Sequence, residues 1–257
     1  MRWTSPAPRS WVCLSLLPIL LLGQQQAQQT PKAAPALPAH VTPPVPTPSI
    51  PAPTPPSVAP RFLVVLDAAH GGNDTGARIS SNILEKDITL SLTARLRSML
   101  SAHGIGVITT RDSDVNLTPV ARAETANRTP ASACILIHAT ATGSGVHLYT
   151  SSLAATTPTR FAPWQTGQSA YVTQSLKLSS EIDSALAHAQ IPVTLGRTFL
   201  QPMDSLTCPA VAVEVAPLIA GTSMKATPLS DSAYQRSILD ALTAALDEWR
   251  NDWRQQP

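Results

Sequence analysis

Three residues that can bind a metal ion or move a proton lie where buried strands are expected to end, and a fourth lies where a helix is expected to begin. His70 follows the apolar run FLVVLD, His138 ends the run CILIH, and Glu214 lies near the end of AVAVEV. Glu85 stands at the start of a helical segment, just after the loop that leaves the first of these strands. Because ligand sites gather at the carboxyl ends of parallel strands, we expect the four side chains to meet at one edge of a sheet.

Two imidazoles and one carboxylate are a usual ligand set for catalytic zinc and leave a fourth coordination position for water. Zinc lowers the pKa of that water towards ~7 and polarises a scissile carbonyl, and a further carboxylate is then needed to take and return the proton. A single histidine after a buried strand is nevertheless more often a core or turn residue, and a glutamate at a strand end is usually solvated. The residue types alone therefore leave both a metal site and four unrelated side chains open.

The segments around these residues alternate between apolar strands and amphipathic helices. Strands are expected at 62–67, 105–110, 134–138, 146–150 and 210–215, helices at 86–102, 118–127, 170–189 and from 231 onward, and a loop at 156–167. Thr118-Pro119 supplies a hydroxyl N-cap and a proline at the first position of the second expected helix. Gly104 is expected to end the helix at 86–102, and Asp231 is expected to cap the start of the last helix. The alternation predicts a single α/β domain with a central, mostly parallel sheet flanked by helices on both faces.

The first 27 residues have the composition of an export signal. Arg2 and Arg9 precede an apolar run of about 12 residues at 11–22, and small residues follow the run. The run is shorter than the ~20 residues that span a bilayer comfortably, so a cleaved signal at 1–27 is favoured over a retained N-terminal anchor. We therefore expect an exported protein, in the periplasm or the cell envelope.

Proline dominates the next segment. Twelve of the thirty residues at 31–60 are proline, which can neither propagate a helix nor join a central strand. Residues 28–60 are thus expected to form an extended linker, leaving 61–257 as the domain.

Three of the 18 Lys and Arg residues precede the domain and none of the 16 Asp and Glu residues do, so the domain has a formal charge of −1. Without a basic stripe, and with few aromatic side chains, a nucleic-acid partner is excluded.

Several other side chains allow two interpretations each. An oxidising compartment would permit a disulfide between Cys134 and Cys208, but two buried free thiols are favoured because their spacing cannot position the sulfur atoms. His147 could line a cleft beside the metal, although an outward-facing strand residue is the favoured interpretation. Arg111 and Asp114 are expected to hold loops in place rather than to contact substrate.

Short blocks of residues along the whole domain form one ordered pattern. The blocks are His70-Gly71-Gly72 with Asp74 and Gly76-Ala77, Glu85-Lys86-Asp87, Thr110-Arg111-Asp112 with Asp114, Arg122 through Ala126-Asn127, Ile137-His138-Ala139, and Pro209-Ala210-Val211 leading to Glu214. In order and approximate spacing, this pattern resembles the zinc-dependent N-acetylmuramoyl-L-alanine amidases of the AmiC-like (amidase type 3) family.

The resemblance implies a function and a set of roles. It makes residues 61–257 an amidase catalytic domain with one zinc ion held by His70, Glu85 and His138, and with Glu214 as catalytic base and acid. The expected substrate is peptidoglycan, cut at the amide between the lactyl group of N-acetylmuramic acid and L-alanine of the stem peptide. We expect a monomer, and the sequence does not identify a protein activator.

The residues that flank the four reacting groups differ from the family pattern. The differences lie at Ala68-Ala69, Leu136, Thr140 and Ala216-Pro217. Where the family has Pro-Gly, Ala69 would cost of order 1 kcal/mol if the turn needs a positive φ. These differences motivate an alternative, a catalytically degenerate peptidoglycan-binding or regulatory module. A zinc peptidase is a weaker alternative because the chain has no HExxH helix.

Overall fold

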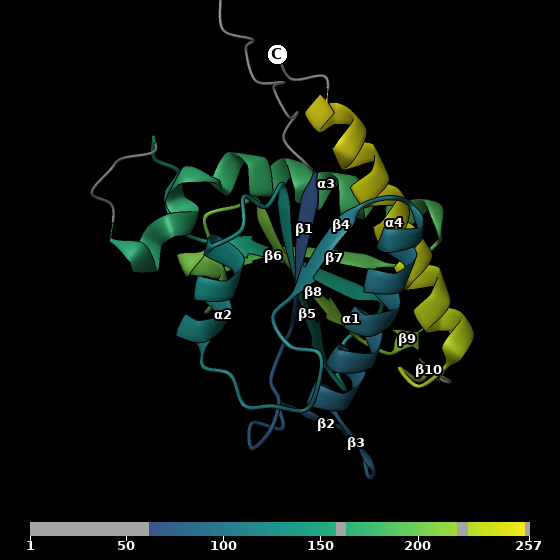
Figure 1. Ribbon diagram of the computed structural model, residues 1–257. Coiled ribbons are helices and arrows are strands. Elements are labelled where there is room, and N and C mark those ends of the chain that lie inside the picture. Colours follow the sequence, from purple (N-terminus) through teal and green to yellow (C-terminus); the bar gives the residue numbers. More distant parts are fainter. Residues whose placement is uncertain (1–61, 158–162, 220–225, 255–257) are drawn as a thin grey trace, which may run out of the picture. The chain divides into compact units, whose positions relative to one another are not determined.

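The computed structural model describes residues 62–157, 163–219 and 226–254 (Figure 1). The predicted signal at 1–27 and linker at 28–60 lie outside the described residues, so both remain predictions. Among the helices of the described part, none has the length and apolar character needed to cross a membrane.

A six-stranded sheet in the order β4-β1-β5-β8-β6-β7 forms the centre of the domain. Its strands are β1 (Leu63–Ala68), β4 (Gly106–Thr109), β5 (Ala133–Ala139), β6 (Val146–Ser151), β7 (Val193–Thr198) and β8 (Ala210–Val215). Neighbouring strands run parallel except for β6 and β8, which are antiparallel. The central strands are almost wholly apolar because both of their faces are covered. The predicted mostly parallel sheet is confirmed.

Helices cover both faces of the sheet, as predicted. The larger core lies between the sheet and three helices, α1 (Glu85–Ala102), α3 (Val172–His188) and α4 (Ser232–Arg254). A smaller core on the opposite face includes residues of α2 (Pro119–Asn127) and of the short 3-10 helix η2 (Met203–Ser205). Figure 1 shows α2 on one side of the strands and α1 with α4 on the other.

The helix boundaries follow the signals in the sequence. Thr118 Oγ1 accepts a hydrogen bond from the backbone N–H of Ala121 at 3.2 Å and so caps α2. Asp231 caps α4 in the same way, with its Oδ1 accepting from the N–H of Tyr234 at 2.8 Å. Gly104 directly follows His103, the C-cap residue of α1. Its φ of +73° is in the left-handed region, which glycine adopts readily.

Some elements were not predicted. β7 is absent from the expected set because its sequence VTLGRT contains a glycine and polar residues, which lower strand propensity. A 3-10 helix, η1 (Trp164–Ala170), begins inside the segment expected to be a loop. Two small two-stranded sheets, formed by β2 (Arg78–Ser80) with β3 (Ile83–Leu84) and by β9 (Leu218–Ile219) with β10 (Ala226–Thr227), were also missed.

Cys134 and Cys208 form a disulfide, so the expectation of two free thiols was wrong. Cys134 lies on β5 opposite Ala210 of β8, and Cys208 lies two residues before that partner. This strand pairing brings the two Cα atoms to 6.1 Å, within the usual range for a disulfide. The two cysteines are 74 residues apart in sequence, so only the pairing of the strands in the sheet shows that they are neighbours.

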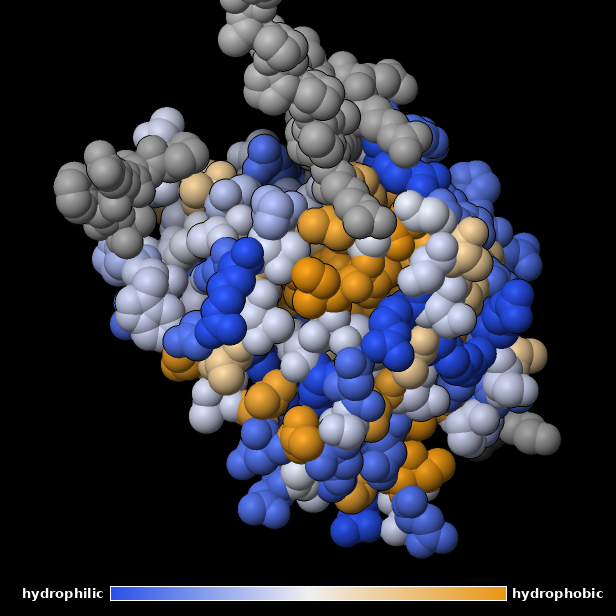
Figure 2. Space-filling model, viewed as in Figure 1, coloured by the Kyte–Doolittle hydropathy of each residue, from blue (hydrophilic) through white to orange (hydrophobic). Residues whose placement is uncertain are grey.

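The surface in the view of Figure 1 is unevenly polar. Figure 2 shows apolar residues, in orange, gathered over the part of the sheet that holds β1 and β4, with hydrophilic residues over much of the remainder. β4 is an edge strand, and Val107 on it is only partly buried against the larger core.

Candidate metal centre

The loop that leaves β1 places His70 in an unusual backbone conformation. His70 has φ +60°, in the left-handed region, which costs a residue other than glycine roughly 1–3 kcal/mol. Two buried arginines hold this backbone. Arg122 donates to the carbonyls of Ala68 at 2.6 Å and His70 at 2.5 Å, and Arg111 donates to those of Ala68 at 2.8 Å and Ala69 at 3.0 Å. The predicted loop-holding role of Arg111 is confirmed.

The expected strain at Ala69 is not found. Among the described residues other than glycine, only His70 and Gln190 have positive φ. Ala69 continues the strand direction instead, and its N–H donates to the carbonyl of Ile137 at 3.1 Å. The loss of the family's glycine at this position therefore does not strain the turn, and the strain lies one residue later.

Glu85, the first residue of α1, is buried with its carboxylate between two backbone donors. Oε2 accepts from the N–H of Ala77 at 2.9 Å, and Oε1 accepts from the N–H of Ala139 at 3.2 Å. Gly76 makes room for this arrangement. A Cβ on Gly76 would lie 2.6 Å from Glu85 Oε2 and 2.6 Å from His70 Cδ2, and the residue has φ +62°. Only glycine fits both the conformation and the space.

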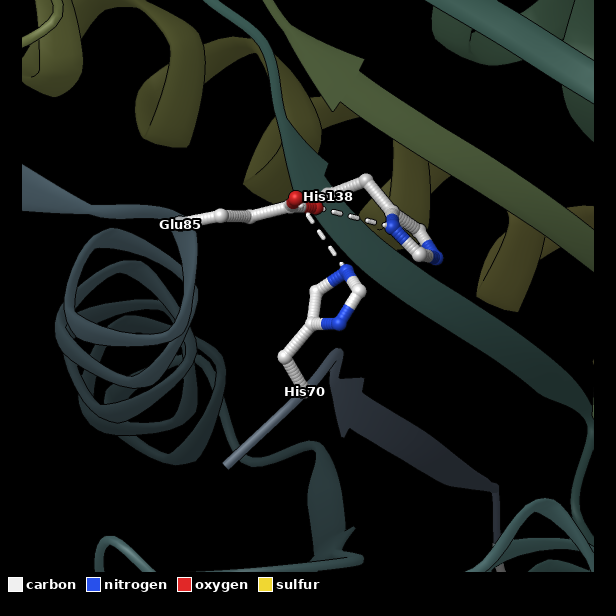
Figure 3. A group of neighbouring side chains, drawn as sticks. All are labelled: His70, Glu85 and His138. Atoms are coloured by element: carbon white, nitrogen blue, oxygen red, sulfur yellow. Dashed lines mark hydrogen bonds and ion pairs between the residues drawn. The ribbon is translucent and has the colours of Figure 1, made fainter. Parts of the chain in front are cut away.

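His70, Glu85 and His138 converge on one another from three separate elements (Figure 3). His70 Nε2 lies 3.1 Å from Glu85 Oε2, and His138 Nδ1 lies 3.0 Å from Glu85 Oε1. One possible ligand atom from each residue lies within 4.8 Å of the others. The two imidazole rings stand edge to face with centroids 5.6 Å apart. The structure therefore brings the three predicted metal ligands together.

Hydrogen bonds within this group shift the pKa of two members. The hydrogen bond with Glu85 raises the pKa of His70 against the effect of burial. Burial acts to raise the pKa of Glu85, but hydrogen bonds from both histidines and from two backbone N–H groups outweigh it and hold that pKa well below its usual range. The carboxylate is thus ionised, which is the form that binds a cation.

The geometry and donor types fit a zinc ion. Ligand atoms around a tetrahedral zinc lie about 3.3 Å apart, given metal–ligand bonds of about 2.0–2.1 Å, and both nitrogen–oxygen distances are close to this value. The other nitrogen of His70, Nδ1, lies 2.9 Å from Asp74 Oδ1, the carboxylate–histidine arrangement that orients metal-binding imidazoles. His138 Nε2 is buried and has no hydrogen-bond partner among the described residues.

Glu214 lies beside this group on the central strand β8. It is the direct partner of His138 on β5 and, on its other side, of His147 on β6. Paired residues of neighbouring strands point to the same face. Glu214 Oε2 lies 2.7 Å from His147 Nδ1. The interpretation of His147 as an outward-facing residue was therefore wrong, because the insertion of β8 between β5 and β6 brings the two residues together.

A family model described as N-acetylmuramoyl-L-alanine amidase matches residues 64–248, more than half of the chain. The chain belongs to the amidase type 3 family. The matched span includes every residue of the metal centre and Glu214, so the family assignment and the site concern the same domain.

Two curated relatives match shorter parts of the chain. The endolysin of Bacillus phage SPP1 is 43% identical over 84 residues, which cover 32% of this chain and 31% of the endolysin. The germination-specific N-acetylmuramoyl-L-alanine amidase of Bacillus subtilis is 46% identical over 57 residues, which cover 22% of this chain and 24% of that protein. The chain thus matches less than a third of the length of either relative.

The fold is also shared with solved structures. The catalytic domain of CwlV, an N-acetylmuramoyl-L-alanine amidase from Bacillus (Paenibacillus) polymyxa, superposes with a TM-score of 0.57 at 22% identity, covering 74% of this chain and 98% of that domain. At this identity the comparison establishes the α/β fold of the family.

Proposed function

We propose that this protein is a zinc-dependent N-acetylmuramoyl-L-alanine amidase, which hydrolyses the amide between the lactyl group of N-acetylmuramic acid and L-alanine of the peptidoglycan stem peptide. The observation that carries the proposal is the convergence of His70, Glu85 and His138, with Glu214 paired to His138 on the next strand. Family membership supports the substrate class, and the two-imidazole, one-carboxylate donor set supports zinc.

His70, Glu85 and His138 would hold the ion. When bound, zinc supplies Lewis-acid polarisation of the scissile carbonyl and lowers the pKa of water. The protein's own contribution is to keep these ligands fixed, through Asp74 on the ring of His70 and through the backbone donors on Glu85. Such outer partners typically change metal affinity or activity by 10–100-fold.

Glu214 would move the proton. Its side chain is 29% exposed, so substrate and water can reach it, whereas Glu85 is buried. As a carboxylate it accepts a proton from the attacking water, and as the resulting acid it returns that proton to the leaving nitrogen of L-alanine. The two glutamates therefore divide the roles of ligand and base according to their burial.

We also propose that the protein acts outside the cytoplasm. Structural disulfides persist in oxidising compartments, and the bond between Cys134 and Cys208 supports such a location. The signal-like N-terminal sequence supports the same conclusion. Peptidoglycan lies in that space, so substrate and compartment agree.

A cleavage assay tests the function. Zinc-loaded protein is incubated with purified peptidoglycan, and the soluble products are identified by mass spectrometry. We expect free stem peptides that begin with L-alanine, and their absence from the Glu214→Gln reaction. If the zinc-loaded protein binds peptidoglycan but releases no stem peptide, the degenerate binding module is the correct function. Replacing zinc by Mg²⁺ should give no product, since magnesium prefers oxygen ligands.

A further inference from the structure

We infer that His147 is a positioning residue for Glu214, to which it donates an Nδ1–H hydrogen bond that fixes the orientation of the catalytic carboxylate. The inference rests on the proposed function, because it assigns His147 a role through the base of that reaction. Neither the family pattern of motifs nor the three-residue metal group includes this histidine.

The role of Glu214 as the base of the proposed reaction, which requires its ionised form, decides which atom of His147 carries the hydrogen. An ionised carboxylate can only accept hydrogen bonds, so the 2.7 Å contact between His147 Nδ1 and Glu214 Oε2 requires the hydrogen on Nδ1. The distance is typical of a charge-assisted bond, which is about twice as strong as one between neutral groups. The side chain of His147 is only 14% exposed, so water competes weakly for this bond.

Another edge of the imidazole lies close to the backbone of Gly143. A Cβ on Gly143 would lie 2.5 Å from Cε1 and 2.6 Å from Nε2 of His147, and Gly143 has φ +85°. The ring therefore lies against bare backbone on one side and against Glu214 on the other. A larger residue at 143 would push the ring out of this position.

The loop that carries Gly143 is itself anchored to the core. The buried hydroxyl of Tyr234, on α4, shares its one hydrogen between the carbonyls of Gly145 at 3.1 Å and Ala216 at 2.9 Å. The N–H of Ala216 donates in turn to the carbonyl of Gly145 at 2.9 Å. A chain of contacts thus extends from the long C-terminal helix to the ring of His147, and such support is what holds a catalytic group within a narrow range of orientations.

The bond to Oε2 leaves the second oxygen of Glu214 for chemistry. Among the described residues, Oε1 has no hydrogen bond. Without His147 the carboxylate could rotate, and only part of its population would face the reacting water and nitrogen. Loss of the bond should therefore lower kcat while leaving KM and zinc binding unchanged.

Substitutions of His147 that distinguish loss of the hydrogen bond from loss of the ring's volume test the inference. We expect His147→Leu to lower kcat about 10- to 100-fold with one zinc per protein and an unchanged KM. His147→Asn should recover most of the loss, because its amide nitrogen can take the place of Nδ1. His188→Leu, at an exposed position on α3, is the matched control and should behave as wild type. A His147→Leu enzyme within twofold of wild-type kcat would overturn the inference, and so would a loss that His147→Asn does not recover.

A double variant and a spectroscopic measurement test whether His147 affects turnover only through its contact with Glu214. In a Glu214→Gln background, His147→Leu should cause no further loss of turnover, whereas a full additional loss would contradict the inference.

The bond can also be observed without turnover, as a far-downfield Nδ1–H signal of His147 in NMR of imidazole-labelled, full-length protein. This signal should move in Glu214→Gln and stay in place in Glu248→Gln, an exposed glutamate on α4. An inactive wild-type enzyme would defeat the proposed function, while an unchanged signal in Glu214→Gln would defeat this inference alone.

Discussion

Glu214 and His138 lie side by side as directly paired residues of β8 and β5, two neighbouring parallel strands. The pairing places a carboxylate on the same face of the sheet as one of the two imidazoles that meet Glu85. Since Glu85 is surrounded by donors and Glu214 is partly exposed, the proposed ligand and the proposed proton carrier occupy adjacent but chemically different environments.

The first prediction separates these two roles. Glu214→Gln removes the proton acceptor but keeps the size of the side chain, so turnover should fall by about 10²–10⁴-fold. Zinc content should stay at one ion per protein, because Glu214 is not among the proposed ligands. Turnover is measured on muropeptides and zinc by mass spectrometry. Glu124→Gln, at an exposed position on α2, is the control. Wild-type turnover in Glu214→Gln would remove the residue from its assigned role.

The second prediction concerns the ligands. His70→Ala and His138→Ala should each weaken zinc binding by more than the 10–100-fold typical of an outer partner, because each removes a direct bond to the metal. His188→Ala should retain wild-type affinity, since that ring lies on the exposed side of α3. Affinity is measured by competition with a chelator, and circular dichroism confirms that each variant is folded. Normal zinc affinity in either ligand variant would disprove its assignment.

A third prediction follows from the space beside Glu85. Gly76→Ala introduces a Cβ 2.6 Å from both Glu85 Oε2 and His70 Cδ2, so it should displace both ligands and weaken zinc binding at least tenfold. Gly104→Ala is the control because Gly104 also has a positive φ, +73°, but nothing lies within 4 Å of its added Cβ. It should lose about 1 kcal/mol of stability and retain zinc. Equal zinc affinities in the two variants would show that the site tolerates the displacement.

The meeting of the three candidate ligands at one edge of the sheet was predictable from local patterns in the sequence, whereas their role as a zinc-binding set was implied only by the resemblance to the family. The apolar runs before His70 and His138 mark buried strands, and the helix that starts at Glu85 has a clear 3.6-residue periodicity. Parallel strands then bring their ends together whatever the order of the strands. The other contacts of the site could be predicted only from the order of the strands in the sheet. The contact between His147 and Glu214 exists because β8 lies between β5 and β6, and no spacing along the chain specifies this insertion.

Other features were missed for the same reason or because they depend on backbone angles. The disulfide joins Cys134 to a residue that only the pairing of β5 with β8 brings near. His70 has the left-handed conformation, and arginines bind the carbonyls of its loop, whereas the comparison with the family pattern predicted strain at Ala69. Both cases are tertiary contacts overriding a local expectation.

The fourth prediction concerns the disulfide. Replacing Cys134 and Cys208 by alanine should lower the free energy of unfolding by about 2–4 kcal/mol, because the bond restricts the unfolded chain. The measurement is urea denaturation in a Cys13→Ala background, which removes the remaining thiol. A reducing agent should destabilise the parent protein to a similar extent and leave the double variant unchanged. A parent that is insensitive to the reductant would mean that the bond does not form in solution.

The most direct test of the metal centre is a crystal structure of the zinc-loaded protein, with anomalous data collected at the zinc edge. We expect one anomalous peak bonded to His70, Glu85 and His138 at about 2.0–2.2 Å, with Glu214 nearby but not bonded to the ion. A peak bonded to other residues, or none at this position in protein that contains zinc, would contradict this expectation.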